Sequence, residues 1–155
     1  MRVGLISDTH GKLRPQVLTH FGGVDLILHA GDVNGLELLD ELALIAPVRA
    51  VWGNTDGMDH RAHLPEVAEV EAADRRIVVV HGHQLGSPTP ERLVEQWPDA
   101  DVIVYGHTHR PMERRAGKAL VLNPGGAGAA RFGIPPTVMV LELADGHEAV
   151  ELIEL

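Results

Sequence analysis

The stretch DVIVYGHTHR, residues 101–110, begins as an apolar run and ends in two histidines separated by one threonine. The run 101–105 predicts a short buried strand. His107 and His109 follow it directly, and in an extended chain side chains two residues apart point to the same side. The stretch therefore predicts a strand that delivers a pair of imidazoles to the end of a sheet.

The same pattern occurs after four earlier apolar runs. These predicted strands cover residues 2–7, 25–29, 47–52 and 76–80. The polar groups at their ends are Asp8 and His10, Asp32, Asn54, and His81 with His83. Because ligands bind beyond the carboxyl ends of the strands in an open α/β sheet, we expect all five clusters to meet at one edge.

The remaining pattern predicts the fold class. Helix-like segments separate the strands at residues 15–21, 35–46 and 90–97, and this alternation predicts an α/β domain with a largely parallel or mixed sheet. Strand signals also occur at 119–122, 137–143 and 148–155, with a hairpin turn at Asp145–Gly146. They predict a second, antiparallel sheet layer. No repeat or linker divides the chain, so we expect residues 1–155 to form a single domain.

The composition argues against several classes of partner and binding site. The formal charge of −9 repels polyanions, so we do not expect long nucleic acid as the main substrate. The absence of cysteine excludes disulfides and thiolate metal sites. No apolar stretch approaches the ~20 residues of a membrane span, so we expect a soluble, cytoplasmic protein without a membrane partner. The sequence leaves a homo-oligomer open.

Seven residues form the candidate metal set. They are Asp8, His10, Asp32, Asn54, His81, His107 and His109. They supply imidazole nitrogen and carboxylate or amide oxygen but no sulfur, which suits manganese, iron, zinc, nickel or cobalt. Seven ligands are too many for one tetrahedral ion and fit two ions that share a bridging carboxylate, for which Asp32 is the natural choice. Two divalent cations with two aspartates leave a positive centre that attracts phosphate.

Five motifs, taken in order, carry a family resemblance. They are Asp8-x-His10, Gly31-Asp32-Val33-x-Gly35, Gly53-Asn54, His81-Gly82-His83 and Gly106-His107-x-His109. Together they resemble the signature of the calcineurin-like metallophosphoesterases, and in particular the small single-domain phosphodiesterases of that superfamily. The resemblance implies an α/β fold, a four-layer α/β/β/α sandwich of two mixed sheets flanked by helices.

The resemblance also implies roles for these residues. Asp8, His10, Asp32 and His109 would hold the first ion, and Asp32, Asn54, His81 and His107 would hold the second. The implied activity is hydrolysis of small phosphodiesters by a hydroxide that bridges two divalent ions, with Asn54 and His81 positioning the phosphate. Mn²⁺ is the first expectation, and Ni²⁺, Zn²⁺, Fe²⁺ and Co²⁺ are the alternatives.

One position departs from the family pattern. Thr55 stands where many members have a histidine, and threonine cannot act as an acid near neutral pH. His83 is the candidate that would assist the leaving group, and a supporting position behind the ligands is its alternative. The departure favours diesters over alkyl monoesters. A phosphomonoesterase or nucleotide hydrolase of the same family, and a noncatalytic protein-binding scaffold with this fold, remain alternative hypotheses.

Three further features receive weaker predictions. His29 lies within an apolar strand, so we expect it to hydrogen-bond behind the ligands rather than bind metal. Asn123-Pro124-Gly125 either supports the metal-binding loops or forms a plain turn. Arg131 either clamps a phosphate or is simply solvated.

Overall fold

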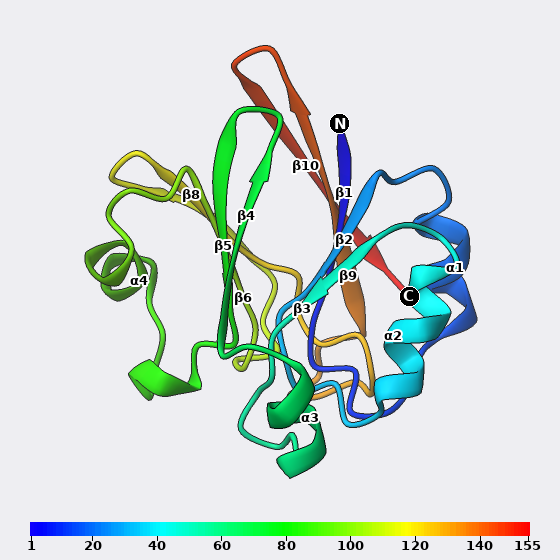
Figure 1. The fold of residues 1–155 in the computed structure, drawn as a ribbon. Helices are drawn as coiled ribbons and strands as arrows, with labels where there is room; N and C mark the ends of the chain where they lie inside the picture. The colour runs from blue at the N-terminus through cyan, green and yellow to red at the C-terminus, as the bar shows by residue number, and fades with distance from the viewer.

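The computed structural model describes residues 1–155 and contains two five-stranded sheets (Figure 1). The first sheet has the order β10-β9-β1-β2-β3. Its strands are β1 (Arg2–Ile6), β2 (Leu26–His29), β3 (Val48–Ala50), β9 (Thr137–Ala144) and β10 (His147–Glu154). The second sheet has the order β4-β5-β6-β8-β7. Its strands are β4 (Val67–Ala72), β5 (Arg75–Val80), β6 (Val102–Tyr105), β7 (Met112–Ala116) and β8 (Ala119–Asn123).

Helices cover the outer faces of the two sheets. α1 (Pro15–His20) and α2 (Leu36–Ala43) lie beside the first sheet, and α4 (Pro90–Gln96) lies beside the second (Figure 1). α3 (Met58–His63) and the 3₁₀ turn η1 (His83–Leu85) lie near one end of the sandwich. Proline begins α1 and α4, as predicted, because its fixed φ suits the first helical turn. None of the helices has the length and apolar composition of a membrane span.

Three apolar clusters hold these layers together. The largest lies between the sheets and includes Leu5, Leu28, Val79 and Leu122. A second packs α1 and α2 against the first sheet. The third packs α4 against the second sheet through Leu93. Because each sheet is buried on both faces, its central strands are apolar throughout. The predicted four-layer α/β/β/α sandwich of two mixed sheets is confirmed.

The C-terminal strands do not form a sheet of their own, so that prediction is wrong. β8 pairs parallel with β6 in the second sheet. β9 pairs antiparallel with β1 and with β10 in the first sheet. Residues 137–141 of β9 are all buried. Burial of consecutive residues requires an interior strand whose sheet is covered on both faces. Each sheet is therefore mixed.

The sequence patterns also missed three elements. β4 and β7 are strands with several exposed charged residues at the two edges of the second sheet, so they lack an apolar run. α3 has no buried residue and therefore no amphipathic pattern. The predicted hairpin turn at Asp145–Gly146 is confirmed, with Gly146 at a φ of 78° between β9 and β10.

Candidate metal centre

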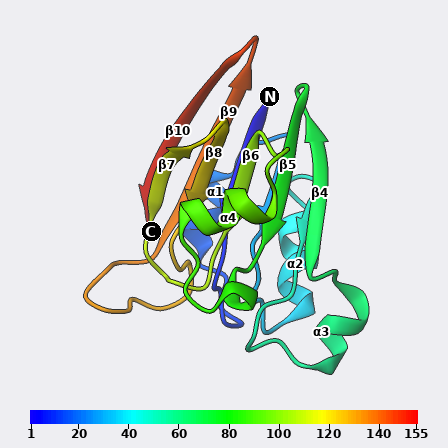
Figure 2. The same ribbon diagram turned by 90° about the vertical axis from the view of Figure 1, so that its left-hand side faces the viewer.

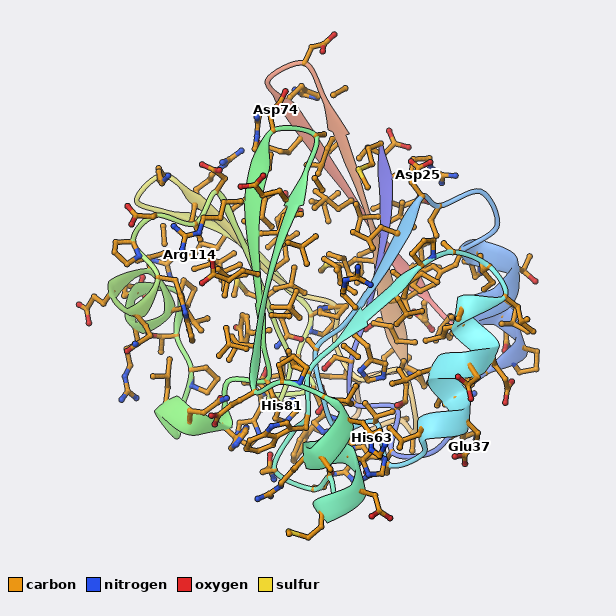
Figure 3. The ribbon with its side chains drawn as sticks, viewed as in Figure 1. Asp25, Glu37, His63, Asp74, His81 and Arg114 are labelled. Atoms are coloured by element: carbon orange, nitrogen blue, oxygen red, sulfur yellow. The ribbon has the colours of Figure 1, made fainter.

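The polar clusters after five strands meet at one end of the sandwich. His81 and α3 residue His63 lie at this end, whereas Asp74 in the β4–β5 hairpin lies at the opposite end (Figure 3). Loops from both sheets contribute: those after β1, β2 and β3 belong to the first sheet, and those after β5 and β6 to the second. The predicted convergence is confirmed, but the site bridges two sheets instead of lining one edge.

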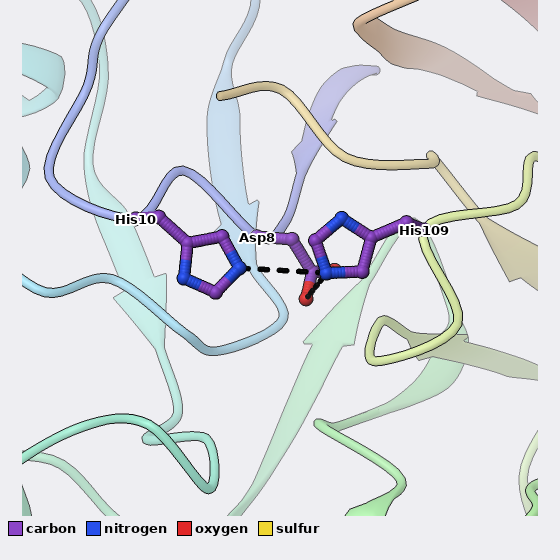
Figure 4. Close-up of side chains that lie close together, drawn as sticks. All are labelled: Asp8, His10 and His109. Atoms are coloured by element: carbon purple, nitrogen blue, oxygen red, sulfur yellow. Dashed lines mark hydrogen bonds and ion pairs between the residues drawn. The ribbon is translucent and has the colours of Figure 1, made fainter. Parts of the chain in front are cut away.

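Two groups of donor atoms are tight enough to hold an ion. In each group all donor atoms lie within 4.8 Å of one another. The first group contains Asp8, His10 and His109 (Figure 4). The second group contains Asp8, Asp32 and His81. Five of the seven predicted residues belong to these two groups. The other two lie beside the second group, where Asn54 contacts His81 and the His107 ring packs against the His81 ring.

The backbone at these positions is not extended, so the geometric reason given for the paired histidines is wrong. Asp8, His10, His107 and His109 have φ values of 53°, 48°, 68° and 56°. Each is in the left-handed region, which costs a non-glycine residue roughly 1–2 kcal/mol. The turns separate the pair: His109 joins Asp8 and His10, whereas the His107 ring packs 5.2 Å from the His81 ring. Strain of this kind concentrates at functional sites.

In the first group, nitrogen and oxygen atoms that can bind a metal face one another. His109 Nε2 lies 3.2 Å from Asp8 Oδ1 and 3.4 Å from His10 Nε2, and the two imidazoles are stacked (Figure 4). Asp8 Oδ2 accepts hydrogen bonds from the Ser7 hydroxyl and the His107 N–H. Asp8 Oδ1 is buried and has no hydrogen-bond partner. Oxygen and nitrogen donors that converge on one point in this way fit a divalent cation.

Neighbouring groups fix the histidine tautomers. His10 Nδ1 lies 2.9 Å from Asn34 Oδ1, which is an acceptor, so Nδ1 carries the proton. His81 Nδ1 likewise donates to the Ala30 carbonyl at 2.7 Å. In both rings Nε2 is therefore the nitrogen that faces the donor groups. This arrangement is the one that metal-binding histidines use.

Asp32 faces both groups. Its Oδ2 lies 3.4 Å from His81 Nε2 and 3.8 Å from His10 Nε2, while its Oδ1 accepts the Thr55 N–H at 2.9 Å. Burial opposes ionisation, but the hydrogen bond and charge of His81 outweigh it and hold the pKa of Asp32 below its ordinary value. For Asp8, burial is the larger effect and raises the pKa to about 6. Asp8 is the residue shared by both tight groups, and the bridging role of Asp32 stays a prediction.

The remaining predicted residues lie around the second group. Asn54 Oδ1 is 3.1 Å from His81 Nε2. His107 lines the adjacent cleft, although its donor atoms belong to neither tight group. His83 lies 5.4 Å from the His81 ring and 5.2 Å from the Trp52 ring, and its Nδ1 is buried without a hydrogen-bond partner. Burial and the neighbouring His81 lower the pKa of both His83 and His107. Their roles stay predictions.

Asp56, which the sequence analysis missed, joins two of the loops. Its buried carboxylate accepts the N–H groups of Val33, Asn34 and Gly53 at 3.1, 2.8 and 2.8 Å. Gly53 approaches so closely that a β-carbon there would lie 2.2 Å from Asp32 Oδ1. Asn34, also missed, orients His10. Both residues stand inside or beside the quoted motifs, and that position was the signal that could have identified them.

His29 lies where it was expected, and Asn123 takes the first of its two predicted roles. His29 is fully buried and lies between the Gly31 N–H and the Thr9 hydroxyl, at 3.2 and 3.0 Å. Burial lowers its pKa to about 4, so the ring is neutral and hydrogen-bonds behind the ligands. Asn123 donates to the Gly106 carbonyl at 2.9 Å and to the Thr108 hydroxyl at 3.0 Å. It therefore supports the loop that carries His107 and His109.

A cleft of about 470 Å³ opens over these groups. Its floor includes His10, Asp32 and His109. One wall is formed by residues 86–88 and another by Arg110, Arg131 and Phe132. The site thus combines buried donor atoms with an open approach, which is the arrangement that a hydrolytic metal site requires.

Known proteins match both the chain and its fold. The model of the calcineurin-like phosphoesterase superfamily domain matches residues 1–146. "Probable metallophosphoesterase" of Methanothermobacter thermautotrophicus is 36% identical, over 96% of this chain and 88% of its own length. Phosphodiesterase YfcE of Escherichia coli is 32% identical, over 92% and 88%. The crystal structure of Vps29 from Entamoeba histolytica complexed with Zn²⁺ has a TM-score of 0.77 and 28% identity, over 99% of each chain. The chain therefore belongs to the calcineurin-like phosphoesterase superfamily and is a phosphoric ester hydrolase.

Proposed function

We propose that this protein is a phosphodiesterase that hydrolyses small phosphodiesters with two divalent metal ions. The observation that carries the proposal is the first donor group, in which a buried, unpaired Asp8 oxygen faces the ring nitrogens of His10 and His109. A second donor group lies beside it and shares Asp8. A folded protein without a cation for these atoms would leave a buried carboxylate oxygen unsatisfied, which is costly.

The proposed ligands follow from the donor groups and the family pattern. Asp8, His10, Asp32 and His109 hold the first ion, and Asp32, Asn54, His81 and His107 hold the second. When bound, two such ions lower the pKa of a water and stabilise the charge that develops on the phosphoryl group. Mn²⁺ is the first candidate because the donors are nitrogen and oxygen only, and Ni²⁺, Zn²⁺, Fe²⁺ and Co²⁺ are alternatives.

The groups around Thr55 support a preference for diesters with good leaving groups. In hydrolysis the water oxygen bonds to phosphorus, the ester P–O bond breaks, and the leaving oxygen departs as an anion or takes up a proton. The Thr55 hydroxyl donates to Asn34 Oδ1 at 3.0 Å, so its proton is already engaged. His83 is the proposed source of assistance, through its place beside His81. Without a strong acid at position 55, slow release of alkoxide leaving groups is expected.

The proposal is tested with metal-stripped protein reconstituted with manganese, nickel or zinc. We expect metal-dependent hydrolysis of bis(p-nitrophenyl) phosphate, faster than that of p-nitrophenyl phosphate. Full activity in both Asp8→Ala and His109→Ala would refute the assignment of the site. A faster monoester would favour the phosphomonoesterase alternative, and a metal-loaded protein inert toward a broad panel of phosphoesters would favour the scaffold.

A further inference from the structure

The glycine-rich loop after β8 ends in a tight turn that displays one aromatic ring. Arg131 and Ile134 exchange both backbone hydrogen bonds, at 3.2 and 2.8 Å, so Phe132 and Gly133 form the tip. Phe132 has a φ of 53° and Gly133 a φ of 74°. Glycine accepts this conformation easily, but a bulky residue rarely does. The Phe132 side chain is nonetheless 73% exposed, so core packing does not explain its presence.

The ring is held next to cationic side chains. The Arg110 guanidinium lies over the Phe132 ring at 5.8 Å, within the range of a cation–π contact. Arg110 and Arg131 take part in none of the ion pairs of the structure, although the chain carries 22 acidic residues. Two unpaired arginines are thus available to an anion at this place.

These residues belong to the wall of the cleft above the donor groups. Phe132, Arg110 and Arg131 line it together with His10 and His109. Figure 2 shows the loop that carries the turn, drawn in orange, extending outward from the sandwich below the start of β9. A substrate bound in the cleft over the donor groups therefore lies beside this turn.

We propose that Phe132 forms a subsite for a flat aromatic group on the part of the phosphodiester that stays with phosphorus, such as the base of a nucleoside. This inference rests on the proposed function. The base stacks on the ring of Phe132, and Arg131 contacts a phosphate oxygen. An exposed ring suits a planar partner, because stacking needs one face and no pocket. An acyl chain is a poorer match, because Phe132 is the one large apolar side chain that lines the cleft.

The test compares two diesters that release the same leaving group. Thymidine 5′-(p-nitrophenyl) phosphate carries a base on the retained side, and methyl p-nitrophenyl phosphate does not. Hydrolysis of either adds water oxygen to phosphorus and releases p-nitrophenolate. We expect the wild type to prefer the thymidine ester, and we expect Phe132→Gly to lower the ratio of the two kcat/KM values about tenfold. Glycine favours the φ of this turn, so misfolding would not explain the loss.

Further variants distinguish loss of the Phe132 ring from general effects on activity. Phe132→Tyr should keep the preference, and Leu44→Ala, which shortens an exposed side chain outside the cleft, should change neither rate. Arg131→Ala should lower both rates without changing their ratio. Calorimetry should show weaker binding of thymidine 5′-monophosphate, but not of inorganic phosphate, to metal-loaded Phe132→Gly.

An unchanged ratio in Phe132→Gly, or the same change of ratio in Arg131→Ala, would overturn the subsite. Failure of the metal-loaded wild type to hydrolyse either ester would instead refute the proposed function.

Discussion

The two ends of the sandwich differ in whether their carboxylate oxygens have hydrogen-bond partners. At the metal-binding end, the buried Oδ1 of Asp8 has no hydrogen-bond partner and faces His109 Nε2 at 3.2 Å. At the other end, near the β4–β5 hairpin, one carboxylate accepts hydrogen bonds from two arginines. Glu148 of β10 accepts from Arg75 of β5 at 2.8 Å and also from Arg115 of β7. Charges at the first end are prepared for a ligand, and those at the second join the two sheets to each other.

This difference predicts which substitutions affect activity and which affect stability. A buried carboxylate with one oxygen that has no hydrogen-bond partner destabilises the metal-free fold, so replacing it with a neutral amide should not weaken that fold. A carboxylate that accepts from two guanidinium groups contributes to stability, so replacing it should weaken the fold and leave catalysis intact. Four substitutions test this contrast, from the largest expected effect to the smallest.

Asp8→Asn should give the largest effect. It removes the carboxylate that both donor groups share, so we expect kcat/KM for bis(p-nitrophenyl) phosphate to fall by about 10³-fold or more. The melting temperature of the metal-free protein should not fall, because the neutral amide relieves a buried charge. Asp99→Asn, at an acid whose side chain is 81% exposed, is the matched control and should change neither quantity. A large loss of stability in Asp8→Asn would contradict the contrast.

His29→Gln should change how stability depends on pH. The pKa of His29 is about 4 in the folded protein and about 6.5 when unfolded, so between these values the unfolded chain binds more protons. Stability from this residue is therefore lost as pH falls from 6.5 to 4, by about 3 kcal/mol in all. Denaturant unfolding of the metal-free protein should show this loss to be absent in His29→Gln. His147→Gln, at an exposed histidine, should keep the wild-type dependence, and an unaltered slope in His29→Gln would refute the role of burial.

Asn34→Gly should weaken metal binding without damaging the turn. Glycine accepts the φ of 55° at this position but removes the oxygen that orients His10. Loss of such an orienting group typically lowers metal affinity by about 10–100-fold. Calorimetric titration of the metal-free protein with manganese measures this affinity. Thr55→Val, which removes only the hydroxyl donor to Asn34, should have a smaller effect; equal affinity in wild type and Asn34→Gly would show that the orientation is unimportant.

Glu148→Gln should have the smallest effect and affect stability alone. We expect the melting temperature to fall by about 2–4 °C while kcat/KM stays unchanged. Hydrogen bonds from Arg75 and then Arg115 hold the pKa of Glu148 below its ordinary value. Its contribution is therefore present above the ordinary pKa of glutamate and disappears as pH falls through the lowered one. The difference from wild type should vanish in acid. Glu151→Gln, exposed on the same strand, is the control, and a persistent difference at low pH would contradict the ion-pair explanation.

The sequence allowed the fold class and the meeting of the clusters to be predicted because buried strands and the polar residues after them are local signals. The placement of β9 between β1 and β10 could not be predicted, since it depends on which strand edge is free after the sheets have packed. Left-handed conformations at Asp8 and His109 were also missed. They arise from contacts with distant loops, such as the Asp8 N–H to the Gly31 carbonyl at 3.0 Å. Asp56 was missed because its role also depends on a distant loop, from whose Val33 and Asn34 N–H groups it accepts hydrogen bonds.

The wide separation of the donors along the chain has a consequence for the order of folding. His10 and His109 are 99 residues apart, yet their ring nitrogens meet. Joining such distant segments carries a large entropic cost, so these contacts form only after more local structure is in place. A nascent or half-folded chain therefore offers no complete site, and uptake of the cation marks the molecules in which both sheets have docked.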